Sequence, residues 1–231
     1  MRYRTVGKTG VKISEIGFGC GNNAVLMVKA SHEDQVKAVR HALDLGINFF
    51  DTAFAHGLGK SEENLGGILK ELGAEPVIST KVRLEADCLG DVRAATIRAV
   101  EAGLSRLQRD HVDFVQLHTR VTLARGMGKR FSLTPQDVFG PNGVIDGFKT
   151  MRDRGKVGHF GFSGLGDPKA LHELVDSGGA PEHATASSIC IVLEKPTRTV
   201  ETSCFIKPKR MAAWVSSFPL TPSADLTFSA R

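Results

Sequence analysis

The stretch Phe49-Phe50-Asp51-Thr52-Ala53-Phe54-Ala55-His56-Gly57 decides how the fold of this chain is interpreted. The largely apolar residues 47–50 predict a buried strand, and Asp51 ends that strand immediately before a glycine-containing loop. A carboxylate in this position lies at the carboxyl edge of a parallel sheet, where ligands bind in α/β proteins. The stretch therefore predicts a buried strand with a functional site at its end.

Two further segments end in the same way. Residues 77–80 form a strand-like run that leads into Lys81, and residues 114–117 form another that leads into His118. Three ionisable groups thus follow three expected strands. Because the carboxyl ends of parallel strands share one edge of a sheet, we expect these groups to assemble one site.

Strand-like and helix-like segments alternate along the chain. Such alternation favours a parallel sheet, because each crossover between parallel strands needs room for a helix. Periodicity alone leaves open whether this sheet closes into a barrel. The expected strands cover residues 16–19, 47–51, 77–81, 112–117, 157–163 and 184–190. The expected helices cover 31–45, 61–72, 91–107, a segment from 135 or 143 to 154, and 168–176, and a β-hairpin is expected over 1–14.

Glycine usage divides the chain into two parts. All 25 glycines precede residue 187, whereas about six would be expected after it if the βα pattern continued, since such units need glycine at helix ends and tight turns. We therefore expect a barrel portion over residues 1–186 and a divergent tail over 187–231.

Composition excludes several classes of protein. The hydrophobic content of 41% and charged content of 24% are ordinary for a soluble globular chain of 231 residues. The net charge of +5 comes from scattered lysines and arginines, so no nucleic-acid partner is expected. No run of about 18 apolar residues and no signal peptide are present, so neither a membrane span nor secretion is expected. The four cysteines lack CxxC pairs and zinc spacing, which indicates reduced thiols in the cytoplasm and no metal site.

Several motifs over residues 1–186 occur together in one order. They are Lys12-Ile13-Ser14-Glu15-Ile16-Gly17-Phe18-Gly19, Phe50-Asp51-Thr52-Ala53, Gly59-Lys60-Ser61-Glu62-Glu63-Asn64-Leu65-Gly66, Ser79-Thr80-Lys81, Val112-Asp113-Phe114-Val115-Gln116-Leu117-His118 and Gly155-Lys156-Val157-Gly158-His159-Phe160-Gly161-Phe162-Ser163. In this order and spacing the chain resembles the aldo-keto reductase family. The resemblance implies a (β/α)8 barrel of the TIM type that reduces small-molecule carbonyls with NADP(H), or alternatively NAD(H).

The resemblance also implies roles for particular residues. Asp51, Lys81 and His118 match three members of the family's Asp-Tyr-Lys-His tetrad, and Asp51 with Ser163 and Gly164 would contact the cofactor. The fourth member departs from the pattern, because His56 occupies the place of the usual tyrosine. The only tyrosine of the chain, Tyr3, lies in the expected hairpin.

Histidine changes the chemistry expected of this position. Its reference pKa of about 6.5 lies far below the roughly 10 of a phenol, and the nearby Lys81 disfavours the charged imidazolium. We therefore expect a reductase that is weakened or shifted to acidic pH, with His56 as a catalytic residue.

Two other functions stay open at this point. The chain could be a non-catalytic, truncated relative with weak or absent cofactor binding, or an aldolase-type barrel that uses Lys81 as a Schiff-base nucleophile. The sequence predicts an incomplete barrel of about six βα units, and an out-of-frame reading of the gene is one hypothesis for the tail. Substrate identity and oligomeric state do not follow from the sequence.

Overall fold

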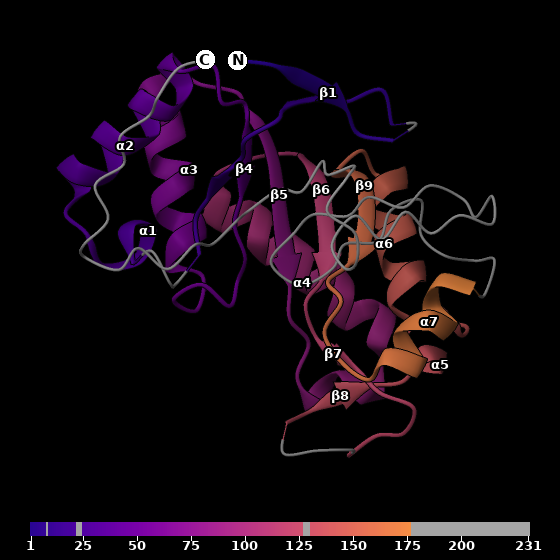
Figure 1. The fold of residues 1–231 in the computed structure, drawn as a ribbon. Helices are drawn as coiled ribbons and strands as arrows, with labels where there is room; N and C mark the ends of the chain where they lie inside the picture. The colour runs from indigo at the N-terminus through magenta and orange to yellow at the C-terminus, as the bar shows by residue number, and fades with distance from the viewer. Residues whose placement is uncertain (8, 22–24, 127–129, 177–231) are drawn as a thin grey trace.

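A five-stranded parallel sheet forms the centre of the molecule (Figure 1). The computed structural model describes residues 1–7, 9–21, 25–126 and 130–176. The strands follow one another in the order β3-β4-β5-β6-β9, and each neighbouring pair is parallel. Their bounds are β3 Phe18–Gly19, β4 Phe49–Asp51, β5 Val77–Val82, β6 Val112–Leu117 and β9 Val157–Phe162.

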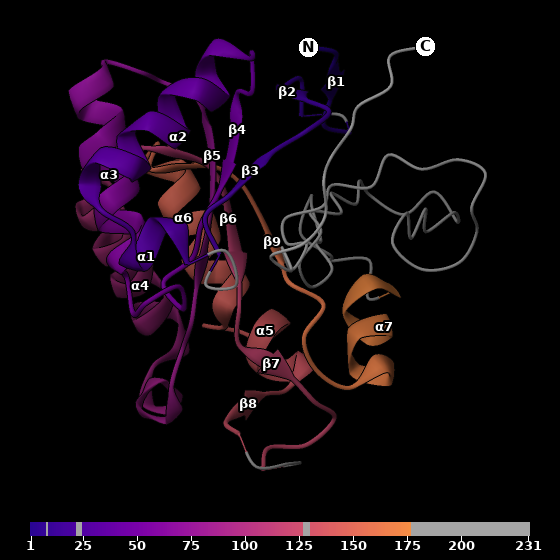
Figure 2. The same cartoon turned by 60° about the vertical axis from the view of Figure 1, so that its left-hand side comes forward.

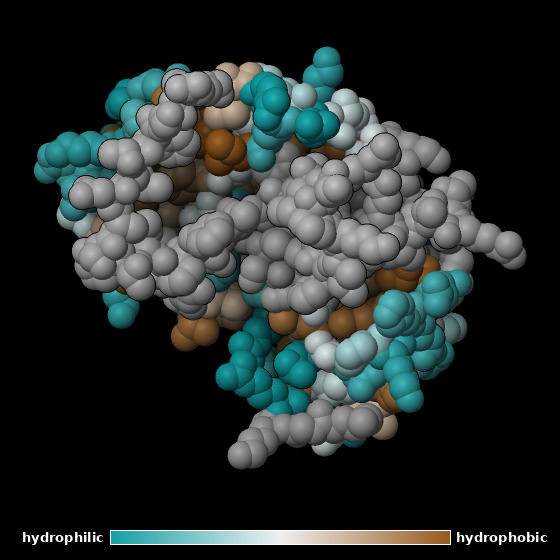
Figure 3. Space-filling view, in the orientation of Figure 1, coloured by the Kyte–Doolittle hydropathy of each residue, from teal (hydrophilic) through white to brown (hydrophobic). Residues whose placement is uncertain are grey.

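Four long helices cover one face of this sheet, as Figure 2 shows. They are α2 His32–Asp44, α3 Lys60–Leu72, α4 Val92–Leu107 and α6 Val144–Asp153. In the space-filling view, hydrophilic side chains cover the outward surface of α2 (Figure 3). A parallel sheet joined by crossover helices on one face is the TIM-barrel-type α/β arrangement, so the fold class predicted from the sequence is confirmed.

Local sequence signals set the ends of these helices. The Ser31 side chain accepts a hydrogen bond from the Asp34 N–H at the start of α2, and Asp91 caps α4 in the same way through the Ala94 N–H. Gly73 ends α3 in the left-handed conformation, with φ of 61°.

The segment in which one helix was expected to start at 135 or 143 contains two helices, α5 Pro135–Phe139 and α6. Thr134 caps α5 and Gly143 precedes α6.

The N-terminal hairpin lies at the amino ends of the strands. β1 (Tyr3–Thr5) pairs with β2 (Lys12–Ser14) in antiparallel register, as predicted. Val6 and Ile13 from the hairpin form a small buried cluster with Phe49 and Phe114 of the sheet. Since Phe49 is the first residue of β4, the hairpin covers the end of the sheet opposite to Asp51.

The loops at the carboxyl edge contain short elements that the sequence patterns did not predict. They are α1 Leu26–Lys29, the 3-10 helix η2 Ala86–Gly90, and the parallel pair β7 Arg120–Val121 and β8 Ser132–Leu133. Arg125 forms an ion pair with the largely buried Asp137, which anchors the segment between β7 and α5. The last described helix, α7 (Pro168–Asp176), follows β9 as expected.

The expected strand over 184–190 and the tail over 187–231 lie outside the described residues. The division of the chain at residue 186 therefore stays a prediction. In the part of the chain that is described, the helices are too short or too polar to cross a membrane.

Candidate active site

A buried ion pair lies at the carboxyl edge of the sheet. Asp51 is the last residue of β4, and Lys81 lies near the end of the adjacent strand β5. Lys81 Nζ is 2.5 Å from Asp51 Oδ2 and also donates a hydrogen bond to the Thr52 carbonyl oxygen at 3.0 Å. The two residues are only 9% and 8% exposed, so each charge depends on the other for stabilisation.

Two histidines lie close to this pair. His56 belongs to the loop after β4, and His118 directly follows β6. Their rings lie edge to face, with centroids 6.4 Å apart and an interplanar angle of 85°. The buried Nδ1 atoms of both rings and Asp51 Oδ1 lack a hydrogen-bond partner among the described residues, so all three atoms have capacity for a bound molecule.

The surroundings keep both imidazoles neutral at pH 7. The pKa of His56 is lowered from 6.5 to about 4, mainly by burial and then by the positive charge of Lys81, while Asp51 acts in the opposite direction. The pKa of His118 is also lowered to about 4, mainly by burial and to a smaller extent by Lys81 and His56. A lowered pKa of His56 is the direction that the sequence analysis expected from the nearby Lys81.

Ser163 and Gly164 follow the end of β9, one of the two edge strands of the five-stranded sheet. Ser163 is buried, and its hydroxyl donates a hydrogen bond to the Leu117 carbonyl oxygen at 3.0 Å. Leu117 immediately precedes His118, so this bond ties the two strand ends together. The remaining lone-pair capacity of the Ser163 hydroxyl is available to accept a hydrogen bond.

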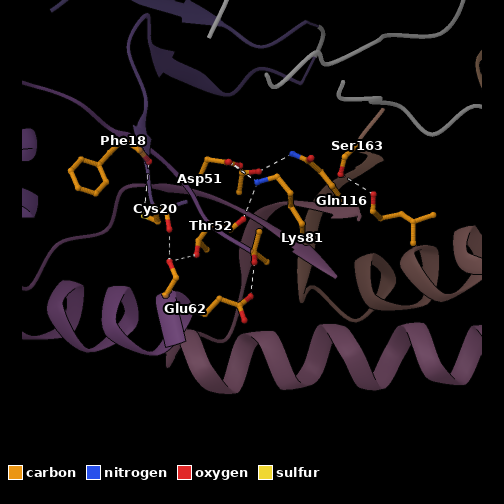
Figure 4. A network of polar contacts seen from close by, with 12 residues as sticks. Phe18, Cys20, Asp51, Thr52, Glu62, Lys81, Gln116 and Ser163 are labelled. Carbon is orange, nitrogen blue, oxygen red and sulfur yellow. Dashed lines mark hydrogen bonds and ion pairs between the residues drawn. The ribbon is translucent and has the colours of Figure 1, made fainter. Parts of the chain in front are cut away.

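A network of hydrogen bonds supports the ion pair from behind (Figure 4). The Ser61 hydroxyl lies 2.9 Å from Thr52 Oγ1 and donates to the Cys20 carbonyl oxygen at 2.9 Å. The Cys20 N–H in turn donates to the Asp51 carbonyl oxygen at 2.8 Å. These bonds connect β4, α3 and the end of β3, so the backbone on both sides of Asp51 is fixed.

Sequence reasoning missed a second buried carboxylate. Glu62 had no role of its own in the sequence analysis, yet it is 1% exposed. It accepts hydrogen bonds from Thr80 Oγ1 at 2.6 Å and from Arg106 Nε at 2.7 Å. A signal existed, because Glu62 lies three and seven residues before the buried Leu65 and Leu69, on the apolar face of α3.

The arrangement suits proton transfer to an oxygen atom. His56 and His118 can each offer a hydrogen bond or a proton, and the Lys81 ammonium stabilises negative charge nearby. Within residues 1–176, leaving aside the three short undescribed gaps, no group of three or more potential ligands could hold a metal ion.

Comparison with known sequences points in one direction. The model of the aldo/keto reductase family matches residues 15–205. The aldo-keto reductase YhdN of Bacillus subtilis (strain 168) is 34% identical over 125 residues, which cover 51% of this chain and 38% of that protein. An L-galactose dehydrogenase of Arabidopsis thaliana is 35% identical over 122 residues, with the same coverage of 51% and 38%. The match therefore spans little more than a third of the length of these curated relatives.

Solved structures share the fold. The holo form of an aldo-keto reductase from Bacillus halodurans has a TM-score of 0.60 and 24% identity, covering 82% of this chain and 58% of that one. An aldo-keto reductase from Klebsiella pneumoniae, solved in complex with NADPH, has a TM-score of 0.56 and 26% identity, covering 75% of this chain and 54% of that one.

Proposed function

The chain belongs to the aldo/keto reductase family, and from this premise we propose that it is an NADP(H)-dependent oxidoreductase acting on an aldehyde or ketone. The observation that carries the proposal is the buried Lys81–Asp51 ion pair, with His56 and His118 beside it at the carboxyl edge of the sheet. The NADPH complex of a family member supports the choice of cofactor. The free, buried thiols of Cys20 and Cys88 support a reducing compartment, the cytoplasm.

The described residues fit the nicotinamide end of such a cofactor. Asp51 Oδ1 is buried without a hydrogen-bond partner among the described residues, so it can accept from a ribose hydroxyl. Ser163, with Gly164 beside it, can accept from a carboxamide N–H while its hydroxyl donates to Leu117. When bound, the nicotinamide supplies a hydride to the carbonyl carbon or removes one from the alcohol.

His56 and His118 share the task of binding the carbonyl oxygen. As a neutral imidazole, His118 donates an N–H hydrogen bond that orients the oxygen. His56 gives up the proton that this oxygen gains during reduction. Burial and the charge of Lys81 lower the pKa of His56, which makes the imidazolium a stronger acid but a rarer species at pH 7.

This balance predicts a slow reductase that works best in acid. With a pKa of about 4, the protonated fraction of His56 rises about tenfold for each pH unit from 8 down to 5. We therefore expect kcat/KM for NADPH-dependent reduction of a simple aromatic aldehyde to rise by nearly the same factor. The His56→Tyr variant, which introduces a phenol beside Lys81, should be faster at pH 7 and lose most of this pH dependence.

Initial rates between pH 5 and 8 test the proposal, with circular dichroism at each pH to verify that the protein is folded. The exposed His111, which contacts the Gly155 carbonyl oxygen, gives the matched control His111→Tyr, and its profile should equal that of the unmodified chain. A flat profile for the unmodified chain would contradict the role of His56. Absence of activity in both the unmodified chain and His56→Tyr would instead favour a non-catalytic relative.

The contacts of Lys81 give no support to the Schiff-base alternative. That chemistry needs a neutral amine as the nucleophile, whereas Asp51 Oδ2 and the Thr52 carbonyl oxygen both stabilise the ammonium form. Borohydride trapping in the presence of an aldehyde would modify Lys81 only if this alternative were correct.

A further inference from the structure

Arg106 reaches from the last turn of α4 to the loop that carries His56. We call residues 52–59 the His56 loop. The Arg106 guanidinium carbon lies 4.9 Å from the centroid of the Phe54 ring, two residues before His56. On the other side of His56, a Cβ atom added at Gly59 would lie 2.6 Å from Arg106 Cδ. The arginine therefore contacts the loop both before and after the histidine.

Glu62 holds Arg106 in this position. The carboxylate is 1% exposed and accepts from Arg106 Nε at 2.7 Å and from Thr80 Oγ1 at 2.6 Å. A buried carboxylate needs such partners, because an unpaired charge in the interior is costly. Thr80 directly precedes Lys81 on β5, so Glu62 joins Arg106 to the strand that supplies the catalytic lysine.

No side-chain hydrogen bond at the buried Nδ1 anchors the ring of His56 among the described residues. The backbone is better defined, since the His56 N–H donates to the Ala53 carbonyl oxygen at 3.1 Å and the His56 carbonyl oxygen accepts from the Ser61 N–H at 3.2 Å. The position of this backbone sets where the ring can lie, and Gly21 lies near the far end of the ring, since a Cβ added at Gly21 would be 3.8 Å from His56 Nε2.

We propose that Arg106 is a positioning residue for His56: held by its ion pair with Glu62, it clamps the His56 loop at Phe54 and Gly59 and so keeps the imidazole near Lys81. The importance of this clamp for catalysis rests on the proposed function, whereas the contacts that form the clamp belong to the folded chain. Clamping at both ends of a short loop restricts the motion that would swing His56 away from Lys81 and Asp51.

The variant Arg106→Lys tests this inference in the full-length chain. Lysine keeps the charge beside Glu62 but lacks the planar group that covers Phe54. Histidine-selective NMR of the imidazole resonances, with His56 assigned by comparison with His56→Gln, gives a readout that does not require enzymatic activity. We expect the His56 resonances to shift and broaden, and the pKa of His56 to rise by about one unit or more toward 6.5 as water reaches the ring.

Lys81, Asp51 and His118, the charged and titratable neighbours of His56, are unchanged in this variant.

The matched control is Arg109→Lys. Arg109 lies just beyond the same helix end, where it donates to the Ala74 carbonyl oxygen at 2.7 Å and forms an ion pair with Glu75 rather than with the His56 loop. This control should leave the His56 resonances in place. An unchanged His56 in folded Arg106→Lys, or an equal change in Arg109→Lys, would overturn the inference.

A second variant covers the case in which Arg106→Lys does not fold. Phe54→Leu removes the ring under the guanidinium and leaves the Glu62–Arg106 pair intact. It should displace the same His56 resonances, and an undisturbed His56 in this variant would refute the clamp. Because the NMR result stands without any turnover, a chain that reduces no carbonyl disproves the proposed function and leaves the test of the clamp valid.

Discussion

At the scale of single residues, two buried histidines make the stability of the fold depend on pH. His56 and His118 are buried beside Lys81, and the pKa of each is lowered to about 4. In the unfolded chain both histidines return to about 6.5. Between these values the unfolded state binds more protons than the folded state, so acid favours unfolding.

This sign leads to a prediction for stability. Above pH 6.5 the two neutral histidines do not lower the free energy of unfolding. As the pH falls from 6.5 toward 4, the free energy of unfolding decreases by a few kcal/mol in total. Urea denaturation midpoints measured from pH 7.5 to 4.5 should decline, and His118→Asn should decline less steeply. The exposed His111, changed to Asn, serves as control and should follow the unmodified chain. A decline equally steep in His118→Asn would contradict the prediction.

The candidate site could be predicted from the sequence because its residues lie directly at strand ends. Asp51, Lys81 and His118 each follow a strand-like run, and the parallel sheet brings such positions to one edge. Glu62 and Arg106 escaped notice because their pairing joins residues 44 positions apart on two helices. No local pattern encodes such a contact, and a charged residue in a first helical turn is usually solvated.

At the scale of elements, helix ends were predictable wherever one residue carries the signal. Ser31 and Asp91 cap their helices through side-chain hydrogen bonds, and Gly73 ends α3. The pair β7–β8 was not predictable, because Arg120–Val121 and Ser132–Leu133 are too short for a periodicity. Their pairing depends on the long connection between them and on the contact of Val121 with Gly166.

One glycine shows how closely α3 and α4 pack. A Cβ at Gly66 would lie 2.3 Å from the Leu107 carbonyl oxygen, whereas a Cβ at the adjacent Gly67 would meet only the Gln108 side chain at 3.8 Å. Since backbone cannot yield as a side chain does, Gly66→Ala must separate the two helices.

We expect Gly66→Ala to destabilise the fold by at least about 2 kcal/mol. The matched variant Gly67→Ala should be neutral or stabilising by up to about 1 kcal/mol, because alanine favours a helix. Calorimetric or spectroscopic melts of the two variants compare the effects, at about 2–4 °C per kcal/mol for a chain of this size. Equal melting temperatures would show that the α3–α4 contact is looser than the structure indicates.

At the scale of the whole molecule, the question is whether the chain holds a complete cofactor. The matched segment spans 38% of each of two curated relatives, and the residues proposed for cofactor binding, Asp51, Ser163 and Gly164, would account for the nicotinamide end alone. The rest of a dinucleotide needs partners elsewhere in the chain. The affinity for NADPH therefore shows whether the full chain supplies partners for the whole cofactor or for its nicotinamide end alone.

A thermal melt with and without NADPH decides this. A ligand that binds only the folded state adds about 2.7 kcal/mol of stability at a hundredfold excess over its dissociation constant. We expect the melting temperature of the full chain to rise with NADPH and to rise less in Asp51→Asn, because Asp51 Oδ1 is the buried acceptor assigned to the ribose. An Asp110→Asn variant, changed at a fully exposed carboxylate, controls for loss of charge. A cooperative melt that NADPH leaves unmoved would mean that the chain keeps the family's ion pair and sheet without its cofactor, and would favour the non-catalytic relative over the reductase.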